Sequence, residues 1–547
     1  MVSAVLFITF FVLLVLNVPI AVCLGLSSAA AILYSGTSLT IVATNIYSGI
    51  SKFLLLAIPF FVLSGNIMAK AGISTRLIRF VDTCVGHRKG GIANVCIIVA
   101  CFFGAISGSG PATVAALGAV LIPAMVERGG FSAAFSTALM ATSSSIAIVI
   151  PPSIAFVVYA SITGVSIGDM FMAGIIPGIL MGLALVVVVM LEVRRNHVMP
   201  SNVEKASAKE RWNAFKDAFW GFLMPIIILG GIYGGFFTPT EAAAVSVVYG
   251  LFVGMVIYKE VKFKDLWEIL IDSAKTTGGI MLIVACASLF SFVCTRFGIS
   301  TAASELLARV AGNQFTFLLI CNIIFLIAGC FIDANSAMYI FIPIMLPVCK
   351  ALGYNVIAFG IMATVNLAIG QVTPPVGVNL FVAIGIKLRD GIRVTLQEIS
   401  RAVVPMVAAS IAVLLIITYI PQISTCLPAA LGSAAAIEND ETVGGDSGTT
   451  QTDNDDFNTI GDYSDLDWAD MTWNFTCSTT ETSTWAQAGR KFGELMEQAT
   501  GGKVKVDVYA ADQLTGGNQS EGIQALMNGD PVQISMHSNL IYSAFDP

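Results

Sequence analysis

Two apolar segments of this chain are each interrupted by a pair of adjacent prolines. The first is residues 133–164, broken at Pro151-Pro152, and the second is residues 356–386, broken at Pro374-Pro375. A proline inside a helix removes a backbone donor and clashes with the preceding turn, so neither segment can be one continuous helix. Within a bilayer, such a break is tolerated only where the freed backbone faces protein, water or a bound ion. Matching breaks in two halves of an apolar chain are typical of a transporter's binding site.

Composition places most of the chain in a membrane. Of its 547 residues, 56% are hydrophobic and 12% are charged, and the mean hydropathy is +0.83. These values are typical of polytopic membrane proteins. Acidic residues gather in residues 438–547, so the net charge of −7 comes from that tail and does not indicate a nucleic-acid partner. The 11 cysteines form no CxxC pair and no cluster with histidine, which argues against a metal cluster.

Apolar segments long enough to cross a bilayer fall into two sets of five. The first set lies at about residues 2–17, 19–35, 53–72, 133–164 and 169–193, and the second at about residues 219–236, 241–258, 275–295, 356–386 and 402–422. The first segment lacks a basic region before it, so we predict a membrane span there rather than a signal peptide.

Between the third and fourth members of each set lies a longer apolar stretch with a break near its centre. Residues 92–125 break at Ser107–Pro111, and residues 315–349 break at Asp333–Ser336. Each stretch is either one kinked crossing or a re-entrant hairpin that enters and leaves the membrane on one side.

The distribution of basic residues decides between these alternatives. If both stretches are hairpins, the basic loops all lie on one side, near residues 76–89, 128, 194–211, 259–264 and 387–401. The opposite side then holds only Lys52, Arg296, Arg309 and Lys350. The positive-inside rule makes the first side cytoplasmic and puts both ends of the membrane part outside. Each half then has about five membrane helices and one hairpin, and the second half is inverted relative to the first.

Landmarks in the two halves support an inverted repeat, with repeat one in residues 1–200 and repeat two in residues 215–425. Pro123 and Pro151 are 28 residues apart, and Pro347 and Pro374 are 27 residues apart. Alternating access is commonly built on such repeats. We therefore predict an all-α polytopic membrane domain over residues 1–425.

Oxygen-bearing side chains lie beside all four breaks, which should converge near the bilayer midplane. They are Ser107, Ser109, Thr113 and Ser143–Ser145 in the first half, and Asp333, Asn335, Ser336, Asn366, Gln371, Thr373 and Asn379 in the second. Such oxygens suit a hard cation, and helix N-termini attract anions. Because no Lys, Arg or His lies at any tip, we expect helix N-termini, hydroxyls and amides to hold an anionic substrate.

Structural roles compete with these assignments. Serine and glycine in membrane helices usually serve close packing, but the Ser107–Pro111 tip recurs at the matching place in the second half, which favours an ion site. Asp333 is an ionisable residue deep in an apolar run and is functional by default, although it could instead lie solvated at a hairpin mouth. Glu241 follows Thr238-Pro239-Thr240, a helix-capping sequence, so we expect it to cap.

An enzymatic function is not supported by the sequence. His87, His197 and His537 lie outside the apolar segments, so no serine there has a neighbouring histidine base. Walker and HExxH motifs are absent, which argues against ATP-driven transport and zinc proteolysis. Secondary transport is the remaining interpretation.

Several motifs together resemble one family over residues 1–425. They are Ala57–Phe61 with Ser64–Asn66, the Ser107–Ala112 tip, Ile150–Ile154, Ala173–Gly178, Thr238–Ala242, and Thr373–Gly377 with Asn379. The chain resembles the large membrane subunit of tripartite ATP-independent periplasmic (TRAP) transporters. The resemblance implies an elevator-type, Na⁺-coupled importer of a small organic acid, such as a dicarboxylate or a sialic-acid-like anion, in the bacterial inner membrane, with no organic cofactor. It also implies two partners, a small four-helix membrane subunit and a periplasmic substrate-binding protein.

The resemblance further implies roles for individual residues. Sodium sites carry over onto Ser107, Ser109, Ser145, Ile148, Pro151, Asp333, Gly370 and Thr373. Substrate contacts are assigned to Thr113, Pro152, Asn335, Ser336, Pro375 and Asn379. The chain departs from the family at Ser143–Ile146, where a glycine is common before Ile-Pro-Pro-Ser.

The tail differs from the membrane domain. After an acidic linker, residues 426–467, residues 468–547 show the pattern strand, helix, strand, helix, as in an α/β lobe. They resemble the first part of a TRAP substrate-binding protein, in stretches such as Trp473–Phe475 and Thr500–Tyr509. The second lobe and its substrate-clamping arginine would lie beyond Pro547, so we interpret the tail as a truncated binding protein or a non-binding remnant. Two other functions stay open: a stand-alone ion-coupled anion transporter of the same build, and a membrane-anchored ligand sensor.

Overall fold

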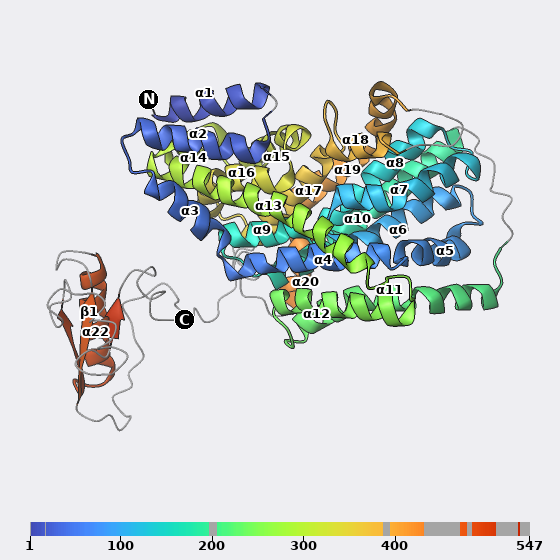
Figure 1. The fold of residues 1–547 in the computed structure, drawn as a ribbon. Helices are drawn as coiled ribbons and strands as arrows, with labels where there is room; N and C mark the ends of the chain where they lie inside the picture. Colours follow the sequence, from blue (N-terminus) through green and yellow to red (C-terminus); the bar gives the residue numbers. More distant parts are fainter. Residues whose placement is uncertain are drawn as a thin grey trace, which may run out of the picture. The chain divides into compact units, whose positions relative to one another are not determined.

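Helices dominate the part of the chain that the computed structural model describes, which is residues 2–16, 18–195, 205–386, 394–431, 471–477, 484–509 and 534–536. The chain divides into two compact units, Met1–Gly445 and Asp446–Pro547. Figure 1 shows the helices of the first unit and the small sheet of the second.

The first half of the membrane unit contains the predicted apolar segments as helices. Its elements are α1 (Val2–Val15), α2 (Ile20–Tyr34), α3 (Thr40–Ile50), the 3₁₀ turn η1 (Phe53–Leu56), α4 (Ala57–Lys70), α5 (Ile73–Val85), α6 (Gly91–Ser107), α7 (Gly110–Glu127), α8 (Ala133–Ser145), the 3₁₀ turn η2 (Ile146–Ile148), α9 (Ile154–Thr163) and α10 (Ile167–Arg195). Helices α3 and α5 are not among the predicted segments.

The second half has a corresponding series of elements. They are α11 (Ala208–Tyr233), α12 (Pro239–Phe252), the π-helical turn η3 (Val253–Ile257), α13 (Asp265–Arg296), α14 (Ile299–Ala311), α15 (Gln314–Phe331), α16 (Ala334–Ala351), α17 (Val356–Gly370), α18 (Val378–Ile384), α19 (Leu396–Tyr419) and α20 (Gln422–Ala430). Helix α14 is not among the predicted segments, and α20 extends into the predicted linker. Helices α11 and α13 begin about ten residues before the predicted segments do, because their polar first turns are helical too.

Nine of the helices in the described residues are long and apolar enough to cross a membrane. Six shorter apolar helices accompany them, including α6, α8, α9 and α17, which flank the predicted breaks. These helices fit the prediction of a polytopic membrane protein.

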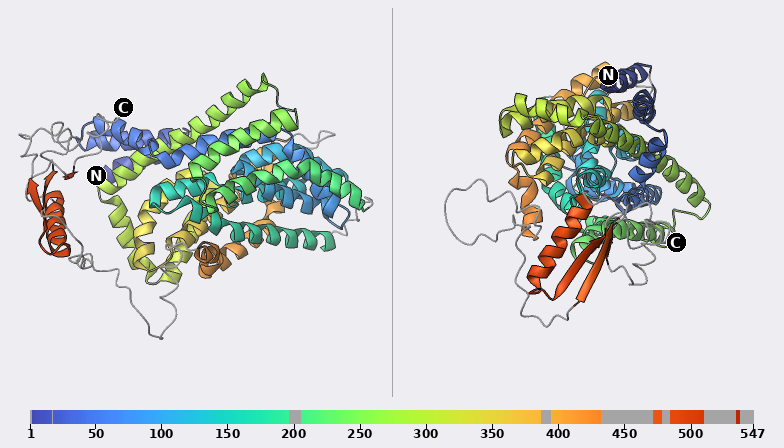
Figure 2. Two further views of the ribbon diagram at one scale, coloured as in Figure 1. Left: turned by 90° about the horizontal axis from the view of Figure 1, so that it is seen from below. Right: turned by 90° about the vertical axis from the view of Figure 1, so that its left-hand side faces the viewer.

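Each broken helix packs against the helix pair of its own half. Helix α8 contacts α6 and α7, and α17 contacts α15 and α16 (Figures 1 and 2). Residues Phe135–Ser145 of α8 and Ile357–Gly370 of α17 are all buried. A helix that is buried on every side belongs in the interior of a membrane protein, and four hydroxyls of α8 donate to backbone carbonyls one turn back in their own helix.

Glu241 caps a helix, as predicted. Its side chain accepts a hydrogen bond from the backbone N–H of Thr238 at 2.8 Å, and the Thr238 hydroxyl oxygen accepts one from the Glu241 N–H at 3.3 Å. This capping box begins α12.

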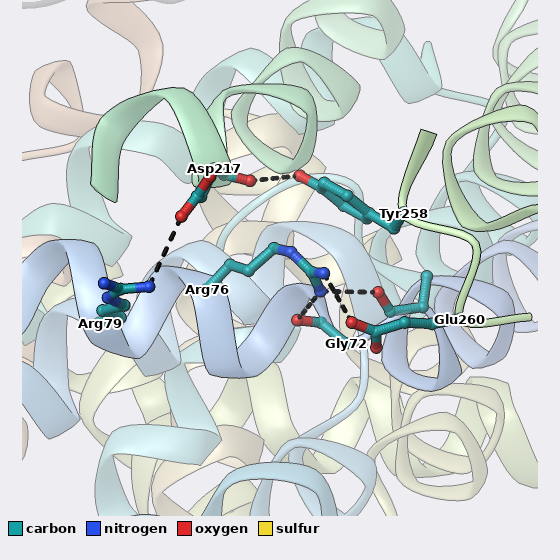
Figure 3. A network of polar contacts seen from close by, with 7 residues as sticks. Gly72, Arg76, Arg79, Asp217, Tyr258 and Glu260 are labelled. Atoms are coloured by element: carbon teal, nitrogen blue, oxygen red, sulfur yellow. Dashed lines mark hydrogen bonds and ion pairs between the residues drawn. The ribbon is translucent and has the colours of Figure 1, made fainter. Parts of the chain in front are cut away.

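A polar network outside the apolar core is built around Arg76 on α5. Its Nη1 donates to the carbonyls of Ala71 and Gly72 at 3.2 and 3.0 Å, and its Nη2 pairs with Glu260 at 2.6 Å (Figure 3). The guanidinium also lies 3.9 Å from the centroid of the Tyr258 ring. Arg76 therefore joins the start of α5 to the segment that follows η3.

Tyr258 extends this network to α11. Its hydroxyl donates to the backbone carbonyl of Asp217 at 2.6 Å, and the Asp217 carboxylate lies 3.6 Å from Arg79 (Figure 3). Burial raises the pKa of Tyr258 to about 12, so the phenol keeps the proton that it donates.

The described residues of the second unit form a three-stranded parallel sheet and one helix (Figure 2). The elements are β1 (Met471–Cys477), α22 (Thr484–Ala499), β2 (Val504–Tyr509) and β3 (Ile534–Met536), in the sheet order β2-β1-β3. In the register of the first pair, Met471 lies beside Val504. β1, α22 and β2 follow one another in the predicted order of strand, helix and strand, and β3 is an additional strand. The predicted second helix, which follows Thr500–Tyr509 in the sequence, lies outside the described residues.

Candidate substrate and ion site

One pocket of about 370 Å³ brings all four breaks together. It is lined by Gly108–Pro111 of the turn between α6 and α7, Ile148, Ile154 and Ala155 of the first broken helix, Asp333–Asn335 of the turn between α15 and α16, and Gln371 of the second broken helix. Lys275, Thr276, Gly279, Ile280 and Ile283 of α13 complete the lining. Segments more than 200 residues apart in the sequence thus share one cavity.

The first turn is shaped by Gly108. Its φ of +59° suits glycine, and a Cβ added there would lie 2.9 Å from the Pro152 carbonyl oxygen, so the turn packs directly on the first break. The Ser107 and Thr113 hydroxyls lie 2.8 Å apart, and Thr113 donates to the Ser109 carbonyl at 2.8 Å. Thr113, which was predicted to contact the substrate, therefore stabilises the turn through hydrogen bonds.

The first break is held by two serines. Ser145 donates to the Thr142 carbonyl at 2.8 Å, and Ser153 donates to the Ile148 carbonyl at 2.5 Å while capping α9. Pro151 and Pro152 are buried. The Ile148 carbonyl, a predicted sodium ligand, keeps one lone pair free after this bond.

Asp333 caps α16 at the second turn. Its carboxylate accepts hydrogen bonds from the N–H groups of Asn335 at 3.0 Å and Ser336 at 3.2 Å, and from the Ser336 hydroxyl at 2.5 Å. The carboxylate is half-buried and lines the pocket together with Asn335. Ser336 is fully buried beneath them.

The second break is tied to both halves of the membrane unit. The Gly377 N–H donates to the Cys330 carbonyl at the end of α15 at 3.3 Å, and Asn379 Nδ2 donates to the Ala141 carbonyl on α8 at 3.4 Å. Gly370 packs against Gly329 so closely that an added Cβ would lie 2.5 Å from the Gly329 backbone. Thr373 donates to the Ile369 carbonyl at 2.7 Å. Pro375, a predicted substrate contact, is exposed and does not line the pocket.

Four buried amide oxygens beside the turns and breaks have no hydrogen-bond partner within the described residues. Asn335 Oδ1 and Gln371 Oε1 belong to residues that line the pocket, and the other two are Asn366 Oδ1 and Asn379 Oδ1. Buried polar atoms are nearly always paired, so unpaired acceptors beside a cavity indicate a ligand or water that completes them. Oxygen acceptors fit a hard cation such as Na⁺. The described residues contain no group of three or more His, Cys, Asp or Glu side chains, the set that a transition metal would use.

Lys275 is the residue that the sequence prediction missed. No basic residue lies at a tip itself, but Lys275 of α13 shares the pocket with both turns. The predicted segment starts at about residue 275, which puts the lysine at its edge. Helix α13 begins at Asp265, so Lys275 lies ten residues inside it.

Two protein families match the chain. The family described as "Tripartite ATP-independent periplasmic transporter, DctM component" matches residues 7–423. The family described as "Bacterial extracellular solute-binding protein, family 7" matches residues 475–547.

Individual relatives are similar over most of the membrane unit. The C4-dicarboxylate TRAP transporter large permease protein DctM of Rhodobacter capsulatus is 38% identical, over 77% of this chain and 97% of its own length. The isethionate TRAP transporter permease protein DctMQ of Oleidesulfovibrio alaskensis is 40% identical, over 77% of this chain and 65% of its own length. The sialic acid TRAP transporter large permease protein SiaM of Vibrio cholerae is 35% identical, over 73% and 92%.

A solved structure shares the fold. The crystal structure of the Alcanivorax borkumensis YdaH transporter aligns with a TM-score of 0.51 and 15% identity, over 72% of this chain and 88% of that one.

Proposed function

Because this chain belongs to the DctM component family of tripartite ATP-independent periplasmic transporters, whose members are permeases and not enzymes, we propose that it imports a small organic anion by sodium symport. The observation that carries this proposal is the pocket shared by both turns and both broken helices, whose lining includes the unpaired amide oxygens of Asn335 and Gln371. Such a site offers oxygens to a cation and helix ends to an anion.

The anionic substrate is supported by the N-terminus of α7 at the pocket. Gly110 and Pro111 begin α7 and line the cavity, whereas the N–H groups of Asn335 and Ser336 at the start of α16 already bind the Asp333 carboxylate. The N-terminus of a helix carries partial positive charge and free N–H groups, which bind carboxylates and similar anions. The relatives named for C4-dicarboxylate, isethionate and sialic acid handle compounds that share an acidic group. A dicarboxylate or a sialic-acid-like anion fits this chemistry.

Sodium coupling is supported by the oxygen-rich breaks. One site would use Ser107, Ser109 and the Ser145–Pro151 carbonyls, and a second would use Asp333, Gly370 and Thr373. Hydroxyl, carbonyl and carboxylate oxygens are the ligands that a hard monovalent cation requires, and the C-terminal ends of broken helices supply carbonyls. The unpaired oxygens beside the second turn add further acceptors.

Alternating access between two inverted repeats is the transport mechanism that we propose, with an elevator-type movement of the paired turns. Its support is the matched arrangement of α6, α7 and α8 in one half and α15, α16 and α17 in the other. Each set contains a helix pair joined by a short turn and a helix broken beside it.

We further propose delivery by a periplasmic substrate-binding protein and assembly with a small membrane subunit in the bacterial inner membrane. The solute-binding-family match in residues 475–547 supports delivery by a binding protein, because it joins such a domain to the permease. Delivery also requires the tail to be periplasmic.

Uptake by proteoliposomes tests the proposal. The full chain, reconstituted with its small subunit, should accumulate labelled succinate, isethionate or N-acetylneuraminate only with an inward sodium gradient and a soluble binding protein. Ser107→Ala should abolish sodium-dependent uptake while the protein still inserts. Uptake that requires neither a sodium gradient nor the binding protein would contradict the proposal and support a stand-alone transporter.

A further inference from the structure

We propose that Lys275 is the cationic anchor that binds the acidic group of the transported anion, a role that rests on the transport function proposed above. Lys275 lines the pocket with residues from both turns and both breaks. Among the described residues that line it, Lys275 is the one basic side chain and Asp333 the one acidic side chain.

The position of Lys275 along α13 argues that it faces water. It lies ten residues from the start of the helix at Asp265, which is about 15 Å along the axis. Helix α13 contains a spanning-length apolar window. Asp265, Glu268, Asp272 and Lys275 all lie in the first 11 residues of the helix, so Lys275 is at the edge of its apolar part, where a charged side chain faces water. The side chain is 75% exposed, in agreement with an open cavity around it.

The ammonium of Lys275 is available to a ligand. Its ion-pair partner, Asp272, lies at 3.9 Å, which is beyond hydrogen-bond distance. Lys70 of α4 provides a contrast, because its Nζ donates to the carboxylate of Glu268 on α13 at 3.1 Å. A lysine carries three donors, and within the described residues those of Lys275 have no hydrogen-bond acceptor.

Asp333 does not neutralise this lysine. Its carboxylate accepts three hydrogen bonds from Asn335 and Ser336, and it forms no ion pair with Lys275 in the described structure. The lysine charge therefore adds to the positive helix end of α7. Together they form an anion subsite that hydroxyls and amides alone would not provide.

Uptake kinetics of matched variants test this assignment. In proteoliposomes with the full chain, its small subunit and the binding protein, Lys275→Met should raise the KM for whichever of the three labelled anions the wild type takes up by about tenfold or more, since a charge-assisted hydrogen bond is lost. Lys275→Arg keeps the charge and should restore KM to within about threefold of wild type. The sodium concentration for half-maximal uptake should stay unchanged in both. Lys264→Met, on an exposed lysine before α13, is the control and should behave as wild type.

Chemical labelling tests water access without depending on transport. A membrane-impermeant sulfonated succinimidyl ester should modify Lys275 of the full chain in lipid nanodiscs, and added succinate should slow this modification. Lys275 left unmodified while Lys264 reacts would overturn the inference.

The two proposals fail in different ways. Sodium-dependent uptake with the same KM in wild type and Lys275→Met overturns the lysine assignment alone. A wild-type protein with no sodium-dependent uptake of succinate, isethionate or N-acetylneuraminate overturns the proposed function, and this inference with it.

Discussion

Gly110 lies against the Asn379 side chain, so closely that a Cβ added at Gly110 would be 2.8 Å from Asn379 Nδ2. Gly110 begins α7 after the first turn, and Asn379 lies in α18 after the second break. The same added atom would lie 3.0 Å from Gln371 Oε1, one of the unpaired acceptors of the pocket. The first turn and the second break are therefore in direct contact across the two halves of the membrane unit.

Replacing Gly110 tests this contact. Gly110→Ala should push the Asn379 and Gln371 amides out of place and reduce uptake by at least about tenfold, because misplaced binding groups lose most of their effect. Gly230→Ala, in α11, is the matched control, since an added Cβ there meets nothing within 4 Å. Both variants should insert normally, as measured by size-exclusion chromatography in detergent. Wild-type uptake by Gly110→Ala would contradict the close contact.

Asp333 has a capping role and a proposed sodium role, and one substitution separates them. Asn is as good an N-cap as Asp, so Asp333→Asn should keep the thermal stability of the protein near wild type. The lost charge should raise the sodium concentration for half-maximal uptake by about tenfold or more. Asp333→Ala should lose both stability and sodium affinity. If Asp333→Asn keeps wild-type sodium affinity, the carboxylate serves only to cap α16.

Arg76 and Arg79 lie on the same helix but should differ in their effect on stability. Arg76 donates to two backbone carbonyls, forms an ion pair with Glu260 and lies over the Tyr258 ring. Arg76→Ala should therefore lower the free energy of unfolding by about 1–3 kcal/mol. Arg79 is 70% exposed and lies 3.6 Å from Asp217, so Arg79→Ala should change the free energy of unfolding by less than about 1 kcal/mol. Thermal unfolding in detergent measures both. Equal losses would show that the network in Figure 3 contributes nothing beyond a surface ion pair.

Cys426 reports on the orientation of the chain. It lies on α20 and is the exposed cysteine among those described. In a Cys477→Ser background, a membrane-impermeant maleimide should label Cys426 from the periplasmic side and not from the interior of the cell. Labelling only in inverted vesicles would overturn the orientation derived from the basic loops.

The breaks could be predicted from sequence because their causes are local. Pro151 and Pro374 interrupt a helix wherever it packs. Gly108 and Asp333 act within their own turns, as a left-handed residue and as an N-cap. The spacing of such residues was enough to predict which segments meet.

Lys275 and the contact between Gly110 and Asn379 could not be predicted in this way. A hydropathy pattern starts the segment where apolar residues begin, whereas α13 continues back through Asp272 and Glu268 to Asp265. Which helix face meets which turn is then set by tertiary packing across hundreds of residues. Helices α3 and α14 were missed for a related reason, since both are short and carry polar residues.

The central claim is that anion entry is coupled to sodium entry, and radioactive sodium flux tests it most directly. Proteoliposomes with the full chain and its small subunit should take up labelled sodium faster when the transported anion and the binding protein are both outside. Asp333→Asn should strongly reduce this anion-dependent sodium flux at the sodium concentration that half-saturates the wild type. Anion accumulation with no accompanying sodium entry would contradict the account.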